Sequence, residues 1–310
     1  MGIIDTTVKD IIALKIQGAS EVRKKAVEAL VKSSQETKAR KPDQFRKEFL
    51  DNTKMLANSR PTEPELRMAI RIIKKSISEK DISIEEMKIR ILRAAKDYEQ
   101  GRKDSLKLIS QYGAEMIKSG STVMTICHSR SVIDLLIKAK HKIKEVYCLE
   151  SRPLYQGRMT AKDLSEAGLK VTLIVDNAAS TVMKKCDYLF SGADAIMADG
   201  DVVNKIGTNQ ISMLCKAYGV KHYVAASTHK FEPASFFGKD EPIEHRNPEE
   251  VISDKERGSA NVLNPAFDRT DASTIEGIIT ELGIFPPQVL AERLFEELGV
   301  NKHKQEFLRL

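Results

Sequence analysis

The residues best suited to chemistry follow short apolar runs in the second half of this 310-residue chain. Cys127 ends one such run, and a thiol at that position can act as a nucleophile or as a proton donor and acceptor. Asp194 follows a later run, within Ser191-Gly-Ala-Asp-Ala195, and supplies a carboxylate. A thiol and a carboxylate with different proton affinities are enough for acid–base catalysis, provided that the fold brings them together.

Each of these residues also has a purely structural interpretation. Cys127 could be a buried hydrophobic side chain, although a position just ahead of a predicted helix would lower its pKa and favour a functional thiol. Asp194 could simply cap a turn. Asn204 and Lys205 open another predicted helix, either as a plain cap with a surface lysine or as an anion site at the helix N-terminus. The residue types alone leave these alternatives open.

Six short apolar runs predict the strands of the sheet that must position these residues. They cover residues 121–127, 145–150, 170–176, 188–192, 222–227 and 275–280. Runs that are apolar almost throughout are typical of strands buried on both faces. Helical patterns at 129–141, 158–168, 178–186 and 204–218 alternate with the first five runs, which predicts a parallel sheet. Residues 228–274 are expected to be irregular, and a last helix is expected over 287–299.

Polar residues follow each of the first five predicted strands. They are residues 127–130, 150–153, 176–177, 192–194 and 227–230. Because ligands of open parallel sheets bind beyond the carboxyl ends of the strands, we expect these segments to form one site. His128 and His229 are interpreted as structural or solvated, since neither has a partner at metal-ligand spacing. No glycine-rich phosphate loop is present, so a nucleotide cofactor is not expected.

The first third of the chain is expected to be helical. Apolar residues recur at helical spacing over 9–32, 41–56 and 82–117, with breaks expected at Gly18 and Gly101. The fold class is therefore α/β, with a helical N-terminal domain over 1–118 and a Rossmann-like parallel-sheet domain over 119–310. The many charged side chains on the outer positions of residues 82–117 are interpreted mainly as a solvated face.

Composition and charge exclude several classes of protein. Aromatic residues make up 5% of the chain and Trp is absent, so a nucleic-acid surface built on aromatic stacking is not expected. No apolar run approaches the roughly 20 residues that span a bilayer, and the N-terminus does not resemble a secretory signal. The four cysteines form no paired or metal-binding pattern and are expected to be reduced, in a cytoplasmic protein. The net charge of +6 suits a phosphorylated ligand or an acidic partner.

Four blocks in the second half resemble one protein family. They are Glu150-Ser-Arg-Pro-Leu-Tyr-Gln-Gly-Arg-Met-Thr-Ala161, Val171-Thr-Leu-Ile-Val-Asp176, Ser191-Gly-Ala-Asp-Ala195 and Asn204-Lys-Ile-Gly-Thr-Asn-Gln210. The family includes the regulatory subunits of initiation factor 2B, methylthioribose-1-phosphate isomerase and archaeal ribose-1,5-bisphosphate isomerase. The stretch 151–158 is most similar to the last of these. The resemblance covers residues 112–300 strongly and the helical part loosely.

This resemblance implies an isomerase that converts ribose 1,5-bisphosphate to ribulose 1,5-bisphosphate. Cys127 and Asp194 would form the catalytic pair, with no metal and no redox cofactor. The residues implied to hold substrate phosphates or hydroxyls are Gln17, Gly18, Arg60, Arg152, Asn204 and Lys205. The chain departs from the usual isomerase pattern at Gln17, Ile126 and Glu63, where the isomerases have an arginine, a histidine and a small or apolar residue.

The same resemblance supports an alternative of another class. A regulatory subunit would bind initiation factor 2 through the basic helices of residues 67–118, and Cys127 and Asp194 would then have no catalytic role. A catalytically inactive sugar-phosphate sensor is a third interpretation. For any of these, the family implies a homodimer formed through the C-terminal domain, or a homohexamer, and the expected ligand is a phosphorylated pentose.

Overall fold

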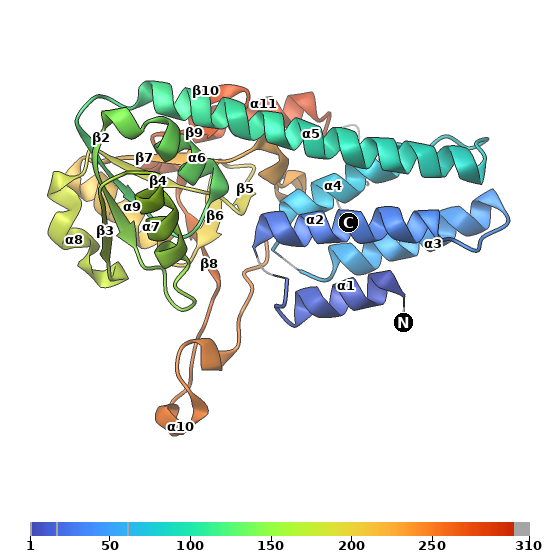
Figure 1. Cartoon of the computed structure of the whole chain (residues 1–310), viewed down its shortest axis with the longest axis horizontal. Coiled ribbons are helices and arrows are strands. Elements are labelled where there is room, and N and C mark those ends of the chain that lie inside the picture. The colour runs from blue at the N-terminus through green and yellow to red at the C-terminus, as the bar shows by residue number, and fades with distance from the viewer. Residues whose placement is uncertain (1, 17, 61, 301–310) are drawn as a thin grey trace. The chain divides into compact units, whose positions relative to one another are not determined.

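The computed structural model describes residues 2–16, 18–60 and 62–300. The chain divides into two compact units, the first ending at Lys103 and the second beginning at Asp104 (Figure 1). Gln17, one of the residues assigned to substrate binding from the sequence, lies outside the described residues. None of the helices in the described ranges is both long enough and apolar enough to cross a membrane.

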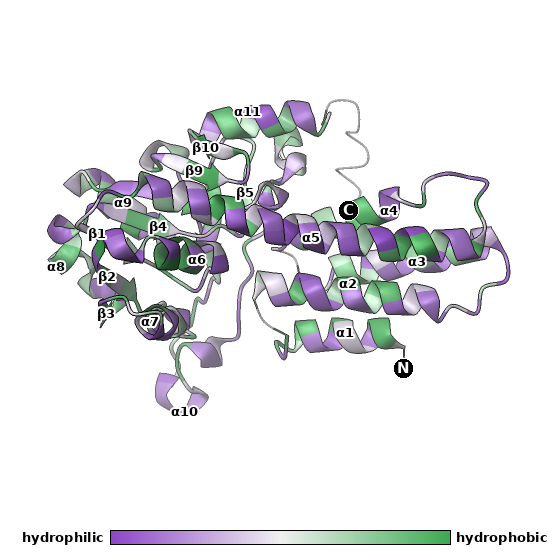
Figure 2. Ribbon diagram, turned by 45° about the horizontal axis from the view of Figure 1, so that its top comes forward, coloured by the Kyte–Doolittle hydropathy of each residue, from purple (hydrophilic) through white to green (hydrophobic). Residues whose placement is uncertain are grey.

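The first unit is helical throughout its described part. Its elements are α1 (Ile3–Ile12), α2 (Ala19–Gln35), α3 (Pro42–Ala57), α4 (Pro64–Lys75) and the first part of α5 (Ile84–Met116). Proline occupies the first position of both α3 and α4, where its missing N–H costs no hydrogen bond. Hydrophobic and hydrophilic segments alternate along α2, α3 and α5, as in amphipathic helices (Figure 2). The buried faces form one core, which includes Leu30, Phe45, Leu56, Ile70 and Ile91.

The predicted helical patterns are confirmed, with one correction. Gly18 has a φ of +78° and separates α1 from α2 as expected. Gly101, in contrast, does not interrupt its helix: it lies inside α5, which is continuous over 33 residues. Glycine inside a helix costs only about 1 kcal/mol relative to alanine, and packing on both sides of Gly101 offsets that cost. Buried residues of α5 lie on both sides of it, Ile91 before and Ile109 after.

The second unit is built on a mainly parallel sheet with helices on both sides (Figure 1). Its strands are β1 (Ser121–Thr125), β2 (Ile143–Leu149), β3 (Val171–Ile174), β4 (Tyr188–Ser191), β7 (Lys221–Ala225), β9 (Gly277–Thr280) and β10 (Gly283–Phe285). Their order is β10-β9-β7-β4-β1-β2-β3, and only β10 is antiparallel to its neighbour. Each of the six predicted strands is confirmed.

Both faces of this sheet are buried, which explains the continuous apolar runs. Val123 and Phe190 belong to the core on one face, whereas their neighbours Met124 and Leu189 belong to the core on the other. The covering helices are α6 (Arg130–Lys138), α7 (Gln156–Glu166), α8 (Ala179–Val182), α9 (Thr208–Tyr218) and α11 (Pro287–Glu297). Short 3-10 helices are η1 (Lys140–Lys142), η2 (Asp176–Ala178), η3 (Met183–Lys185), η4 (Thr228–Lys230), η5 (Pro233–Phe237), η6 (Pro248–Glu250) and η7 (Ala272–Thr274).

A second, antiparallel sheet was not predicted. It consists of β5 (Ala195–Ile196), β6 (Val202–Lys205) and β8 (Phe267–Thr270), in the order β5-β6-β8. The prediction that Asn204 and Lys205 open a helix is therefore wrong, since both end β6 and α9 begins at Thr208. Residues 228–274 are not irregular throughout either: β8 lies within them, as does α10 (Asp254–Arg257), on a segment that extends away from the sheet (Figure 1).

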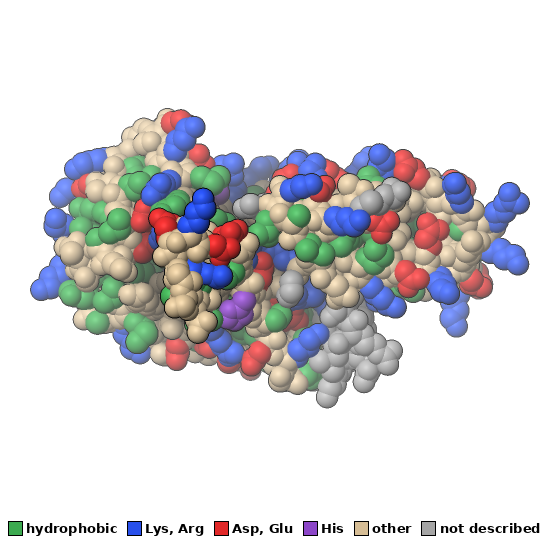
Figure 3. All heavy atoms as spheres, turned by 90° about the horizontal axis from the view of Figure 1, so that it is seen from below, with side chains coloured by type: hydrophobic (Ala, Val, Ile, Leu, Met, Phe, Trp, Pro, Cys, Tyr) green, Lys and Arg blue, Asp and Glu red, His purple; other side chains and the backbone are tan. Residues whose placement is uncertain are grey.

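Charged side chains of both signs cover the described surface. On the face drawn in Figure 3, lysine and arginine side chains are interspersed with aspartate and glutamate rather than gathered into one field. This agrees with 50 basic and 44 acidic residues in the whole chain. The charges that bear on chemistry are therefore the few that are buried or half-buried.

Two glycines provide a matched test of the packing. A Cβ added to Gly157 would lie 1.7 Å from the backbone oxygen of Leu149, whereas one added to Gly101 would meet nothing within 4 Å. We expect Gly157→Ala to lower the free energy of unfolding by about 3 kcal/mol, because the backbone of β2 must move. Gly101→Ala should raise it by about 1 kcal/mol. Urea unfolding followed by circular dichroism measures both, and equal effects would contradict the packing described here.

Candidate active site

The strand order reverses direction between β1 and β4. From β1 the chain proceeds outward through β2 and β3, then returns to place β4 on the other side of β1. In open parallel sheets this reversal opens a crevice at the carboxyl ends of the two central strands. Cys127 follows β1 and Asp194 follows β4. The two residues that sequence reasoning paired are thus at the same end of neighbouring strands.

Cys127 is held by its backbone in an uncommon conformation. Its φ is +67°, a value that costs free energy in any residue except glycine. Its N–H donates to Ser151 Oγ at 2.7 Å, and its carbonyl oxygen accepts from Thr160 Oγ1 at 2.7 Å. Ser151 follows β2 and itself has a φ of +62°. These bonds join the loops after β1 and β2 and fix the direction in which the thiol points.

The pKa of the Cys127 thiol is raised above its ordinary value. Burial is the largest cause, and the negative charge of Asp194 adds to the rise. The positive charges of Lys205 and Lys230 and the N–H of His128 act in the opposite direction. The residue as a whole keeps some exposure to solvent, although its side chain packs against the core on one face of the sheet. Thiol, carboxylate and two ammonium groups therefore share one electrostatic environment.

This direction corrects the sequence-based expectation. A helix N-terminus close to Cys127 was expected to lower the thiol pKa, but α6 begins only at Arg130. The dipole of a helix acts mainly within its first turn, and burial outweighs it here. The thiol is consequently protonated at neutral pH and is suited to donate a proton.

Asp194 lies in the link between β4 and β5. Its N–H donates to the carbonyl oxygen of Val203 on β6 at 2.8 Å, which ties the link to the second sheet. A Cβ on Gly192, two residues earlier, would lie 2.7 Å from Ser129 Oγ, so only glycine lets this link approach the segment after Cys127. Local packing therefore holds the loops after β1 and β4 together.

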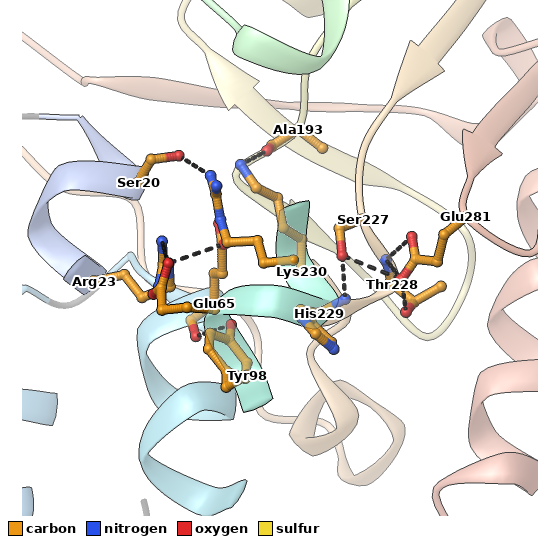
Figure 4. Close-up of polar contacts among 12 residues, drawn as sticks. Ser20, Arg23, Glu65, Tyr98, Ala193, Ser227, Thr228, His229, Lys230 and Glu281 are labelled. Carbon is orange, nitrogen blue, oxygen red and sulfur yellow. Dashed lines mark hydrogen bonds and ion pairs between the residues drawn. The ribbon is translucent and has the colours of Figure 1, made fainter. Parts of the chain in front are cut away.

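Lys230 is the cation that the sequence-based assignment missed. It ends η4, after β7, and its Nζ donates to the carbonyl oxygen of Ala193, next to Asp194 (Figure 4). Glu281 fixes the start of η4 by accepting from the N–H of Thr228 at 3.2 Å and from its hydroxyl at 2.6 Å (Figure 4). The sequence did place residues 227–230 after a predicted strand, and so at the expected site. Nothing in the pattern distinguished Lys230 from its neighbours in that segment.

Asn204 and Lys205 approach the same region from β6. Lys205 Nζ lies 5.1 Å from the centre of the Phe267 ring, and its charge reaches the Cys127 thiol. Asn204 is buried, and its Nδ2 donates to Thr208 Oγ1 at 2.9 Å. Its Oδ1 lies 3.9 Å from the position that a Cβ on Gly192 would take. Both residues therefore belong to the neighbourhood of Cys127 and Asp194, on a strand rather than at a helix start.

Arg152 is tied into the loop after β2. Its N–H and that of Ser151 each donate to the Asp176 carboxylate at 2.7 Å. Its guanidinium donates to Tyr155 Oη at 2.6 Å and to the carbonyl oxygen of Val251 at 2.8 Å. Two of its five N–H donors are thus used by the protein. Arg152 adjoins the site through Ser151, whose hydroxyl holds the Cys127 backbone.

The remaining candidates belong to the first unit. Arg60 is buried, with Nε 3.8 Å from a Glu63 carboxylate oxygen. Gly18 is the N-cap residue of α2. Glu65 Oε1 lies 3.2 Å from Arg23 Nε (Figure 4) and 2.7 Å from Arg102 Nε. The carboxylates after Arg60 are therefore compensated by arginines of their own unit.

Two histidines of the second unit lie beside hydroxyl groups. His128 Nδ1 lies 3.1 Å from Thr160 Oγ1, and burial lowers the pKa of His128, with Asp163 opposing that shift and Arg130 adding to it. His222 is fully enclosed between the hydroxyls of Ser191 and Ser212, and burial lowers its pKa to about 3. Across 2–16, 18–60 and 62–300, no three His, Cys, Asp or Glu side chains are grouped to hold a metal ion.

Comparison with known proteins defines the family. Residues 15–287 match the model of the initiation factor 2 subunit family. The chain belongs to this family, as the four sequence blocks predicted. It is 36% identical to the ribose 1,5-bisphosphate isomerase of Thermococcus kodakarensis over 92% of each chain. It is 35% identical to the methylthioribose-1-phosphate isomerase of Bacillus velezensis, over 88% of this chain and 82% of that protein.

Solved structures share the fold. The translation initiation factor eIF-2B of Pyrococcus horikoshii OT3 superposes with a TM-score of 0.79 at 26% identity, over 92% of this chain and 97% of that one. The 5-methylthioribose 1-phosphate isomerase of the same organism gives 0.78 at 30% identity, over 95% and 88%. Because one fold carries both kinds of protein, the function must be inferred from the site.

The shared electrostatics of the site can be tested without substrate. Iodoacetamide reacts with thiolates, so its reaction with Cys127 should be slow at neutral pH and faster at higher pH. Asp194→Asn should speed alkylation at a fixed pH, because loss of the carboxylate lowers the thiol pKa. Lys205→Met should slow it. Peptide mass spectrometry measures the rates, with Asp199→Asn as control, and unchanged rates in both variants would show that the three groups lie apart.

Proposed function

We propose that this chain is an aldose–ketose isomerase that converts ribose 1,5-bisphosphate to ribulose 1,5-bisphosphate. One observation carries the proposal: the Asp194 carboxylate and the ammonium groups of Lys205 and Lys230 all act on the Cys127 thiol, at the carboxyl ends of neighbouring strands. The name of the Thermococcus kodakarensis relative and the identity to it over 92% of each chain support the choice of substrate. A phosphorylated pentose also fits the two ammonium groups that face the thiol.

The reaction needs one proton donor and one proton acceptor. A phosphate on the anomeric carbon prevents spontaneous opening of the sugar ring, so the ring oxygen must gain a proton as its bond to C1 breaks. One hydrogen moves from C2 to C1, and the C2 hydroxyl loses its proton to become the ketone. The ring oxygen gains one proton and the C2 hydroxyl loses one, so the balance closes. No redox cofactor is needed, since oxidation at C2 and reduction at C1 occur in one molecule.

Cys127 and Asp194 suit these two roles. Burial keeps the thiol protonated at neutral pH, so Cys127 can donate to the ring oxygen. Asp194 then serves as the acceptor for the proton released at C2. Return of this proton to the sulfur restores the starting state. We assign the pair these roles because each group begins in the protonation state that its step requires.

The two lysines supply positive charge where the substrate carries negative charge. Lys205 and Lys230 both act on the Cys127 sulfur, so a substrate next to that sulfur also lies within their reach. We propose that Lys205 and Asn204 bind a phosphate or hydroxyl group of the substrate and that Arg152 contributes through its remaining donors. Assignment of Gln17, Gly18 and Arg60 to substrate binding stays a prediction, as do a cytoplasmic location and assembly as a homodimer or homohexamer.

A second candidate function follows from the Pyrococcus horikoshii translation initiation factor structure. In that case the chain is a regulatory subunit that binds initiation factor 2. Incubation of the purified protein with ribose 1,5-bisphosphate separates the two candidates. Formation of ribulose 1,5-bisphosphate supports the isomerase, whereas absence of turnover together with co-purification of initiation factor 2 supports the regulatory subunit.

The catalytic pair is tested by substitution. Asp194→Asn and Cys127→Ser should each lower kcat by about 10²–10⁴-fold, because each removes a proton donor or acceptor. The controls Asp199→Asn and Cys186→Ser make the same chemical changes elsewhere in the second unit and should keep activity. A coupled assay of ribulose 1,5-bisphosphate measures turnover, and unfolding midpoints confirm that the variants fold. Full activity in either site variant would remove that residue from the mechanism.

Lys205→Met tests the anion-binding assignment. We expect KM for ribose 1,5-bisphosphate to rise roughly tenfold to hundredfold, because a hydrogen bond to a charged group contributes about 1.5–3 kcal/mol. Lys216→Met is the matched control, since Lys216 is an exposed lysine on α9 whose Nζ lies 3.3 Å from Ser273 Oγ. Steady-state kinetics give both constants, and an unchanged KM in Lys205→Met would place the phosphate elsewhere.

A further inference from the structure

Asp268 is a carboxylate on β8 that the proposed chemistry does not use. It lies opposite Asn204 in the β6–β8 ladder, and its neighbour Phe267 lies opposite Lys205. Burial raises the pKa of Asp268 to about 6, although hydrogen bonds from Asn209 and Gly207 and the charge of Lys205 oppose the rise. Because the folded state holds this proton more tightly than the unfolded state does, the ionised carboxylate costs folding free energy above pH 6. A cost of this kind indicates a role other than stability.

The carboxylate caps α9 from a different strand. Asp268 Oδ2 accepts from the N–H of Gly207 at 2.7 Å, and both carboxylate oxygens lie 3.2 Å from the nitrogen of Asn209. Gly207 is the N-cap residue and has no side chain that could accept these bonds. Its φ of +97° is a conformation that favours glycine at this position. Asp268 thus accepts the backbone hydrogen bonds that an N-cap side chain accepts in other helices.

The turn fixed in this way continues to Asn204 through Thr208. Thr208 Oγ1 donates to the carbonyl oxygen of Lys205 at 2.6 Å and accepts from Asn204 Nδ2 at 2.9 Å. Thr208 and Asn204 are both buried, so water does not replace these bonds. The relay from Asp268 through Thr208 therefore sets the orientation of the Asn204 amide beside Gly192.

The same carboxylate acts on Lys205 by charge. The Lys205 ammonium lies over the Phe267 ring, 5.1 Å from its centre, and its positive charge opposes the rise in the Asp268 pKa. α9 faces Asp268 with backbone N–H groups. Arg269, next along β8, is directed away, and its guanidinium pairs with Asp199, Asp201 and Asp240. Lys205 is thus packed on an aromatic ring and lies within the electrostatic reach of the Asp268 carboxylate.

We propose that Asp268 is a positioning residue for the isomerase proposed above. Its carboxylate holds the turn between β6 and α9 and thereby presents Asn204 and Lys205 to the phosphate or hydroxyl groups of the substrate. Asp268 touches neither the thiol nor the substrate in this role. The identity of the substrate rests on the proposed function. The positioning role itself rests on the hydrogen bonds of Asp268 and Thr208.

Kinetics of four variants test the relay. Asp268→Asn and Thr208→Val should each raise KM for ribose 1,5-bisphosphate about tenfold, with a smaller change in kcat, because each removes one step of the relay. Thr208→Ser keeps the hydroxyl and should remain close to wild type. The double variant Asp268→Asn with Thr208→Val should have a KM no higher than that of the single variant with the higher KM, since both substitutions break one path. Unchanged KM in Asp268→Asn, or fully additive effects, would overturn the proposal.

A pH profile separates positioning from a merely structural role. Affinity in the wild type should weaken as pH falls through about 6, where Asp268 takes up a proton. The substrate phosphates also titrate near this pH, but they do so equally with every variant. In Asp268→Asn, affinity should therefore change with pH only as far as titration of the substrate phosphates requires. Parallel profiles for the wild type and Asp268→Asn would show that the charge of Asp268 has no part in binding.

Alkylation of Cys127 distinguishes failure of this inference from failure of the proposed function. Lys205 lowers the Cys127 pKa, so displacement of its ammonium in Asp268→Asn should slow the reaction of Cys127 with iodoacetamide, while Thr208→Ser should not. Slowed alkylation without any turnover by the wild type would overturn the isomerase and support the positioning role. Turnover by the wild type, with unchanged KM and unchanged alkylation in Asp268→Asn, would overturn the positioning role alone.

Discussion

The pairing of β1 with β4 is the constraint on which the candidate site depends. The two strands run parallel with Thr125 level with Phe190, so the segments that leave them begin at the same height. One segment turns toward β2 and the other toward the second sheet, and the space between them is where chemistry can occur. Gly192 lets the two segments touch, since a side chain there would collide with Ser129. A shift of register by one residue would turn every side chain of the strand to the other face.

Within this crevice, burial and charge act against each other. Loss of solvent favours the neutral thiol at Cys127, and the Asp194 carboxylate favours it further, while two ammonium groups limit the effect. The result is a neutral thiol beside a carboxylate, with positive charge nearby that suits the phosphorylated sugar proposed as substrate. Each contribution comes from a different strand end, so the site is a property of the sheet rather than of any single loop.

Much of this arrangement could be predicted from the sequence because strands buried on both faces have a distinctive composition. The six apolar runs and the rule about strand ends placed Cys127 and Asp194 at one edge of the sheet, and the resemblance to the isomerases then paired them. The second sheet escaped prediction because β5 has only two residues, and because at least half of the four residues in each of β6 and β8 are polar and form no apolar run. Asn204 and Lys205 were therefore assigned to α9, which begins only at Thr208. Lys230 and Asp268 act through tertiary contacts, with the carbonyl of Ala193 and the N–H of Gly207, which no local pattern records.

The protonated state of the Cys127 sulfur also affects how the protein withstands oxidants. Peroxides attack thiolates, so a catalytic sulfur that burial keeps neutral forms sulfenic acid slowly. Cys148, Cys186 and Cys215 are buried as well, and burial raises the pKa of each to about 12. Enzymes that use a thiolate as nucleophile lose activity under oxidative stress. If Cys127 acts only as a proton donor, as proposed, its thiol can stay reduced without a dedicated reducing partner.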